Sequence, residues 1–119
     1  MPVRSLSSSV LKWPSKEAVD EAVRRWAWEN ARSNGDVLKI GYFGSYARGD
    51  WGVGSDLDII VVLKQSDQPA ERRGVKWDAT ELPVPADLLI FTEKELAGLG
   101  GKFSLVLQEE TIWIYERAG

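Results

Sequence analysis

The chain has 119 residues, which is enough for one small domain with a single core and too few for two. Its net charge of −3 gives no basic footprint, so general electrostatic binding to nucleic acid is not expected. The chain has no cysteine and no histidine, which excludes disulfides, thiol or histidine catalysis, and zinc sites built from those residues. Catalysis would have to use carboxylates, hydroxyls, Lys, Arg, the backbone or an oxygen-bound metal such as magnesium.

The N-terminal part of the chain predicts one long helix. Residues 1–13 are rich in serine and are expected to be loose; they lack the apolar run of a signal peptide or a membrane span, which favours a cytoplasmic protein. Ser15 is a suitable N-cap and Asn34-Gly35 is a stop signal, so we expect a helix over 16–33. The helical spacing predicts a buried stripe of Ala18, Ala22 and Trp26, with Val19 and Val23 as further members.

The remainder predicts a small mixed β-sheet flanked by helices, in the α/β (α+β) class. Four segments are expected to be strands: 37–43, 58–63, 86–92 and 111–115. The continuous apolar run of the second is typical of a central strand covered on both faces. The expected helical segments are a turn at 45–48 closed by Gly49, a short helix or irregular crossover within 69–80, a helix capped by Thr92, and a turn near 103–107.

Six tryptophans are many for so short a chain. Core packing is the simpler explanation, because a small domain needs large side chains to fill its interior. The alternative is that Trp51 and Trp77 lie on a surface that meets a substrate or a partner.

A glycine and a serine follow the first predicted strand. Gly44 has no side chain, so a phosphate could approach the backbone there, and Ser45 offers a hydroxyl and an N–H. The start of a helical turn adds further N–H groups. Arg48, one turn further, could reach an anion or could instead form a salt bridge.

Two carboxylates open the second predicted strand. Asp56 and Asp58 have the spacing that places side chains on one face of a strand, where like charges repel unless a cation lies between them. Asp56 could simply cap the preceding turn. Asp58 leads directly into an apolar run, where a carboxylate is costly unless it is paired or bound to a metal.

A third carboxylate, Asp87, opens the third predicted strand. Its apolar neighbours suggest that this strand is buried like the second, with an acid at the same end. If the two strands are neighbours, these acids converge at one edge of the sheet. Three oxygen ligands without His or Cys are what a pair of magnesium ions requires, and such ions promote in-line displacement at a triphosphate. The three acids and the Gly-Ser turn together are far more specific than any one of them.

These residues carry a resemblance to a known family. GSYARGDWGVGSDLDIIVVL resembles the signature of the polymerase-beta-type nucleotidyltransferase superfamily: Gly-Ser, ten residues, then Asp-x-Asp. The short chain is similar to the minimal nucleotidyltransferases (MNT proteins), which are often antitoxins paired with a helical HEPN-domain toxin. ADLLIFTEKEL resembles the third-acid strand and following helix, and LVLQEETIWIYE the usual ending. The segment 64–83 matches less well.

The resemblance implies a role for each matched residue. Asp56 and Asp58 would ligate the metals, and Asp87 would ligate one metal and act as base toward the acceptor hydroxyl. The residues implied to hold the triphosphate are Gly44 and Ser45, with Arg48 as a helper. The implied reaction transfers a nucleoside monophosphate, usually AMP from ATP, to a hydroxyl and releases pyrophosphate with the help of two magnesium ions.

Several functions remain open at this point. The first is an active nucleotidyltransferase, whose acceptor could be a tyrosine of a HEPN partner or a small-molecule hydroxyl. The second is an antitoxin that neutralises such a toxin mainly by binding. The third is an inactive or structural module, against which the intact acids argue. We expect a single domain whose acceptor comes from another molecule, and homo-oligomerisation stays open.

Overall fold

The computed structural model describes residues 13–74 and 77–117, so the predicted loose segment lies outside the described residues except for Trp13. The helices and strands in chain order are α2 (Lys16–Arg32), β1 (Val37–Phe43), α3 (Ser45–Arg48), β2 (Leu57–Leu63), α4 (Ala70–Arg73), β3 (Ala86–Thr92), α5 (Glu93–Gly98), α6 (Gly101–Glu110) and β4 (Ile112–Glu116). All four predicted strands are present. The largest difference is α6, a helix of 10 residues where the sequence predicted a single turn.

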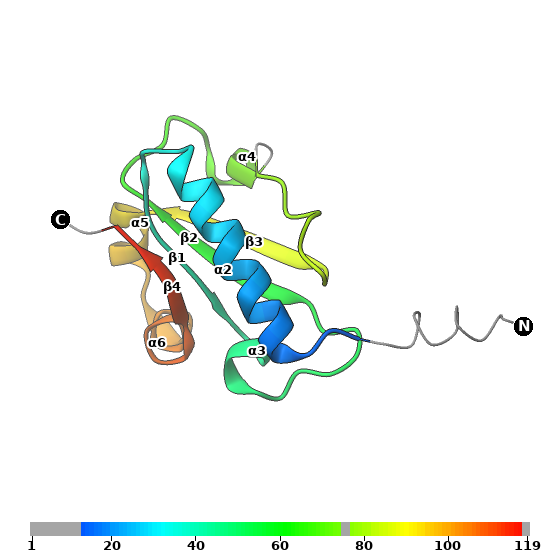
Figure 1. Ribbon diagram of the computed structural model, residues 1–119. Helices are drawn as coiled ribbons and strands as arrows, with labels where there is room; N and C mark the ends of the chain where they lie inside the picture. The colour runs from blue at the N-terminus through cyan, green and yellow to red at the C-terminus, as the bar shows by residue number, and fades with distance from the viewer. Residues whose placement is uncertain (1–12, 75–76, 118–119) are drawn as a thin grey trace, which may run out of the picture.

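The strands form one mixed sheet in the order β3-β2-β1-β4. Strand β1 is antiparallel to both of its neighbours, and β2 and β3 are parallel. Strands β2, β3 and β4 therefore run in the same direction, and their first residues lie at the edge where β1 ends. Helix α2 crosses in front of the sheet while α5 and α6 lie behind it (Figure 1). The predicted class, a small mixed sheet flanked by helices, is confirmed.

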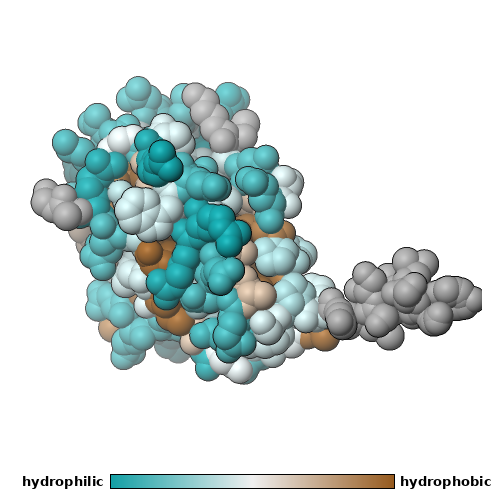
Figure 2. Space-filling view, viewed as in Figure 1, coloured by the Kyte–Doolittle hydropathy of each residue, from teal (hydrophilic) through white to brown (hydrophobic). Residues whose placement is uncertain are grey.

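Helix α2 covers one face of the sheet. The Ser15 side chain accepts a hydrogen bond from the Ala18 N–H, which is the predicted N-cap. The buried residues are Val19, Val23, Trp26, Ala27 and Ala31. The predicted stripe was therefore centred too early: Ala18 is exposed, because the sheet meets the face that begins at Val19. The outward face of α2 is a hydrophilic band in Figure 2.

Strand β2 is buried on both faces, as predicted for a central strand. Its odd-numbered residues, Leu57, Ile59, Val61 and Leu63, belong to the core cluster that also contains the buried face of α2. Because side chains alternate along a strand, Asp58 and the buried Ile60 face the opposite side, toward α5 and α6. The face of the sheet that is turned toward α5 and α6 therefore carries the Asp58 carboxylate.

Strand β3 is less buried than its apolar sequence suggested. It lies at the edge of the sheet, and both Asp87 and Leu89 are exposed. Only Ile90 is buried within this strand. Asp87 therefore opens an edge strand whose outer side is open to solvent. The prediction that two buried strands carry the acids was right for β2 and wrong for β3.

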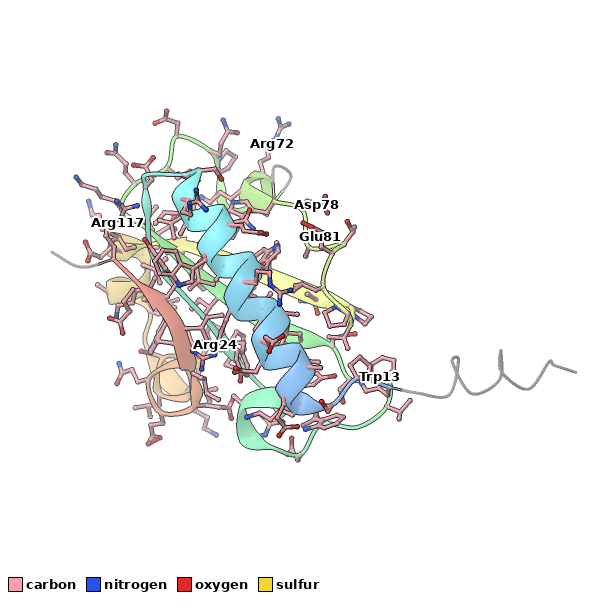
Figure 3. The ribbon with its side chains drawn as sticks, viewed as in Figure 1. Trp13, Arg24, Arg72, Asp78, Glu81 and Arg117 are labelled. Atoms are coloured by element: carbon pink, nitrogen blue, oxygen red, sulfur yellow. The ribbon has the colours of Figure 1, made fainter. Side chains whose placement is uncertain are left out.

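The tryptophans that were candidates for a surface role pack against the core. Trp51 stacks on the buried Tyr46 ring, with ring centroids 5.4 Å apart, and Trp77 lies 5.6 Å from the ring of Trp26. Trp13, at the start of α2 (Figure 3), donates a hydrogen bond to the Tyr46 hydroxyl at 3.0 Å. Core packing thus accounts for these side chains, whereas Trp28 is exposed. No helix among the described residues is long and apolar enough to cross a membrane.

The crossover between β2 and β3 is anchored by Arg73. Its guanidinium donates to the backbone oxygens of Gln68 at 2.9 Å and Ile90 at 3.1 Å. It also makes two hydrogen bonds with the Glu95 carboxylate, at 2.5 and 3.0 Å. Glu95 in turn completes a capping box with Thr92 at the start of α5. One buried guanidinium thus joins α4, β3 and α5.

Replacing Arg73 by Met is expected to lower the free energy of unfolding by about 2 kcal/mol, because two carbonyl oxygens and a carboxylate lose their donor. Chemical denaturation monitored by circular dichroism would measure the loss. The matched control is Arg72→Met, which removes the same charge from an exposed neighbour and should change stability by less than about 0.5 kcal/mol. Equal losses in the two variants would contradict this account of the crossover.

The ion pair between Arg73 and Glu95 predicts an acid-sensitive contribution to stability. The hydrogen bond from Arg73 lowers the pKa of Glu95 from 4.5 to about 2. A carboxyl whose pKa is lower in the folded chain stabilises the fold above its unfolded pKa, and this contribution disappears as the pH falls from about 4.5 toward 2. Glu95→Gln should flatten that part of the pH profile of unfolding. A variant whose acid transition matched that of the wild type would exclude the pair as a cause.

Candidate active site

The candidate site lies at one edge of the sheet, where β1 ends and β2, β3 and β4 begin. Gly44 follows the last residue of β1, and Asp58 pairs with Phe43 across the β1–β2 ladder. Asp58 is also the register partner of Asp87 across the parallel β2–β3 ladder. Paired residues on adjacent strands point to the same face. The topology thus places the Gly-Ser turn and two of the predicted acids on neighbouring strands.

The turn after β1 depends on the glycine at position 44. Gly44 has φ 79° and ψ −152°, a region that is almost restricted to glycine. Its carbonyl oxygen accepts the N–H groups of Ala47 and Arg48, which closes α3, and Gly49 ends this helical turn with φ 90°. The sequence predicted both the turn and its glycine stop.

Gly44 also lies directly against Asp58. A Cβ atom placed on Gly44 would stand 2.2 Å from Asp58 Oδ2, far inside van der Waals contact. Position 44 therefore requires glycine for a second reason, in addition to its backbone conformation. The missing side chain lets the carboxylate of β2 reach the turn that follows β1.

The acids at this edge repel one another. Burial raises the pKa of Asp58 above its ordinary value, and the negative charges of Asp87 and Asp56 raise it further. Asp56 and Asp87 are exposed, whereas Asp58 is half-buried. A raised carboxyl pKa with like charges nearby indicates a position that a cation would stabilise.

The three acids have the ligand chemistry that a magnesium site requires. All are oxygen donors, which magnesium prefers over nitrogen or sulfur. Among residues 13–74 and 77–117, however, no three acidic side chains stand close enough to form a ready-made metal site. Asp58 and Asp87 are thus neighbours across the β2–β3 ladder, but the three acids are not gathered into one group.

Arg48 forms the salt bridges that the sequence left as an alternative. Its guanidinium pairs with Asp50 at 3.1 Å and with Glu110 at 3.2 Å. The second oxygen of Glu110 accepts the Gly44 N–H at 2.9 Å. Glu110 is the last residue of α6 and was not among the predicted site residues. It lies two residues before β4, close to the edge of the sheet at which Asp58 and Asp87 open their strands.

An open cleft of about 480 Å³ joins these groups. Its lining includes every predicted anion-binding residue and two of the predicted acids: Phe43, Gly44, Ser45, Arg48, Ser55, Asp56, Asp58, Val106 and Glu110. Asp87 lies on the neighbouring strand and does not line it. The cleft therefore combines anion donors and carboxylates on one surface, with the third acid beside it.

Tyr42, Tyr46 and Trp51 are near the site in sequence, which made them candidates for stacking on a nucleotide base. Tyr42 and Tyr46 are both buried, so neither ring has a free face to offer. Tyr42 donates its hydroxyl to Asp20 at 2.7 Å, and burial raises its pKa. Trp51 stacks on Tyr46. These rings support the turn from within the core.

Comparison with known proteins places this arrangement in a family. The family model for the nucleotidyltransferase domain matches residues 24–114. A candidate nucleotidyltransferase from Sulfolobus solfataricus is similar in structure, with a TM-score of 0.65 and 20% sequence identity over 86% of this chain and 84% of that protein. No curated protein sequence matches the chain.

Two toxin–antitoxin structures share the fold. One, a toxin–antitoxin with AMP-PNP, has a TM-score of 0.53 and 18% identity over 79% of this chain and 73% of that one. The other, a mutant of the toxin–antitoxin MntA-HpeT, has a TM-score of 0.51 and 15% identity over the same shares. The family match spans every residue of the candidate site. The chain therefore belongs to the nucleotidyltransferase domain family and is a transferase enzyme, as the Gly-Ser and Asp-x-Asp signature predicted.

Proposed function

We propose that this chain transfers AMP from ATP to a hydroxyl group of a partner protein, with magnesium held by Asp56, Asp58 and Asp87. The observation that carries the proposal is the shared register of Asp58 and Asp87 on parallel strands, at the edge where the Gly44 turn ends β1. Family membership supports nucleotidyl transfer in general. The identity of the nucleotide, of the metal and of the acceptor goes beyond family membership and belongs to the proposal.

The anion-binding part of the cleft would hold the triphosphate. The Gly44 N–H, the Ser45 hydroxyl and the Arg48 guanidinium all border the cleft and are donors suited to phosphate oxygens. A guanidinium also binds a doubly charged phosphate strongly, because its donors are fixed in one plane. These residues would orient the leaving pyrophosphate away from the acids.

The carboxylates would act at the other end of the triphosphate. Bound magnesium would neutralise phosphate charge and stabilise the attacking and leaving oxygens of an in-line displacement. Asp87, exposed on the edge strand, would accept the proton of the acceptor hydroxyl. The acceptor oxygen then forms a bond to the α-phosphorus as the bond to pyrophosphate breaks.

A protein acceptor is favoured by the surface around the acids. Three exposed apolar side chains lie near the site: Val106 lines the cleft, Phe103 packs edge-on against Phe43 at the end of β1, and Leu89 follows Asp87 by two residues. Exposed apolar residues beside a site are typical of a surface that meets another protein. Together with the toxin–antitoxin neighbours, they favour a HEPN-domain toxin whose tyrosine receives AMP.

The same apolar surface favours a second candidate function, in which the chain neutralises a toxin by binding alone. The two functions differ in their dependence on Asp58. Binding requires the apolar surface but not the carboxylate, whereas transfer requires both.

The experiment is co-expression of the chain with the product of the adjacent reading frame, followed by intact-mass measurement of the partner. Transfer predicts added AMP units on the partner with wild-type chain and none with Asp58→Asn. Full neutralisation of the partner by Asp58→Asn would favour binding alone. A partner that gains no AMP with either chain, in the presence of ATP and magnesium, would contradict the proposed transfer to it.

A further inference from the structure

The carboxylate of Glu110 occupies two of the donors that the proposed function assigns to the triphosphate. Its Oε2 accepts the Gly44 N–H at 2.9 Å, and its Oε1 accepts from Arg48 Nη1 at 3.2 Å. A carboxylate bridging a backbone N–H and a guanidinium uses these donors as two phosphate oxygens would. The Glu110 side chain is 16% exposed and the Arg48 side chain 50%, so the hydrogen bond to Gly44 is partly buried while the one from Arg48 is open to solvent.

The two anions cannot use the Gly44 N–H at once, although the Arg48 guanidinium has further donors. A backbone N–H has one proton and donates one strong hydrogen bond. A triphosphate seated on Gly44 and Arg48 would also bring its negative charge against that of Glu110, whose side chain is only 16% exposed. Glu110 must therefore leave the Gly44 N–H before a phosphate oxygen can take it.

Helix α6 is loosely attached, which makes this departure feasible. Leu107 is the only buried residue that it contributes among its described side chains. The residue after Glu110, Thr111, has a buried hydroxyl that lacks a hydrogen-bond partner among the described residues. A junction with few buried contacts and an unsatisfied polar group is a place where local rearrangement costs little.

We propose that Glu110 is an internal competitor for the triphosphate: it holds Gly44 and Arg48 in the nucleotide-free enzyme and sets the affinity for nucleotide by having to be displaced. This inference rests on the proposed function for the site of triphosphate binding. It adds a residue, 66 positions from Gly44 in sequence, whose negative charge weakens substrate binding. The enzyme would then bind nucleotide more weakly than its donors alone allow.

The test is the dissociation constant of inorganic tripolyphosphate, measured by calorimetry with magnesium present. This probe has no base or sugar, so it reports the phosphate donors alone. Glu110→Gln is expected to bind it about tenfold more tightly than the wild type, which corresponds to the loss of one charge-assisted competitor. Glu110→Asp keeps the charge but shortens the side chain, and should give an intermediate gain.

Glu109→Gln is the matched control, because it removes the same charge from the exposed neighbouring residue. It should leave the dissociation constant within about twofold of the wild type, since exposed charges are screened. Thermal unfolding of each variant without ligand establishes that it is folded.

Unchanged or weaker binding by folded Glu110→Gln, with transfer activity intact, would overturn this inference and leave the proposed function standing. An equal gain in Glu109→Gln would also overturn it, because general charge would then explain the effect. Tripolyphosphate that bound neither the wild type nor Glu110→Gln would contradict both proposals. If neither Glu110 variant folds, Glu110 is a structural support for the turn and the competitor role is excluded.

Discussion

Asp58→Asn is expected to reduce nucleotidyl transfer by roughly 10²–10³-fold or more, the size of effect seen when one charge-stabilising group is removed from an active site. The stability of the fold should not fall. Burial and the charges of Asp87 and Asp56 raise the pKa of Asp58. A carboxyl whose pKa is higher in the folded chain than in the unfolded one lowers stability at pH values above both, so removing its charge should leave the melting temperature unchanged or higher.

Asp67→Asn is the matched control for this variant, because Asp67 is exposed and lies on the loop after β2, at the end of the strand opposite Asp58. It should retain both transfer and stability. Transfer is measured with labelled ATP and stability by thermal unfolding at pH 7. A clear loss of stability in Asp58→Asn would mean that the carboxylate supports the fold, which is the opposite of the role assigned to it.

Gly44→Ala is expected to be the most damaging of the small substitutions, with a loss of roughly 3 kcal/mol in unfolding free energy and no measurable transfer. The backbone conformation at Gly44 alone costs an L-residue about 1–3 kcal/mol. The added Cβ would also stand 2.2 Å from Asp58 Oδ2, so the carboxylate would have to move. Denaturant unfolding and the labelled-ATP assay measure the two effects separately.

Two other glycines distinguish the effect of backbone conformation from the effect of the contact with Asp58. Gly49 has φ 90° but open space around its Cβ position, so Gly49→Ala should cost about 1 kcal/mol of stability and keep activity. Gly52 has neither a positive φ nor a close neighbour, and Gly52→Ala should be close to wild type. If Gly44→Ala behaved like Gly49→Ala, the contact with Asp58 would not limit this position.

The local structure was predictable from short stretches of sequence. Ser15 and Thr92 cap their helices as expected, because a cap depends on residues within one turn. The strand bounds followed from apolar runs ended by glycine, proline or charge. The turn at Gly44 and its stop at Gly49 followed from the conformational freedom of glycine.

The arrangement of strands was not predictable in this way. The apolar run of β3 suggested a buried strand, but burial depends on a strand's place in the sheet, and β3 lies at the edge. The stripe on α2 was misplaced by one residue because Ala18 and Val19 are both compatible with helical spacing. Only the packed sheet decides which side of the helix faces it.

Glu110 was missed for a related reason. An acid at the end of a helix usually lies in solvent, and its partners Gly44 and Arg48 are more than 60 residues away in sequence. Strand order brings the heads of β2, β3 and β4 to one edge. An acid before an apolar strand was the pattern that identified Asp58 and Asp87, and applying it to the last strand would have identified Glu110.

The measurement that tests the central claim most directly compares ATP labelled on its α-phosphate with ATP labelled on its γ-phosphate. Both are incubated with magnesium, the chain and its co-expressed partner. Nucleotidyl transfer by the acids at this edge predicts that the α-label becomes covalently attached to the acceptor, that the γ-label is released in pyrophosphate, and that Asp58→Asn abolishes the attachment. Attachment of the γ-label, or an α-label that attaches equally well with Asp58→Asn, would contradict the account.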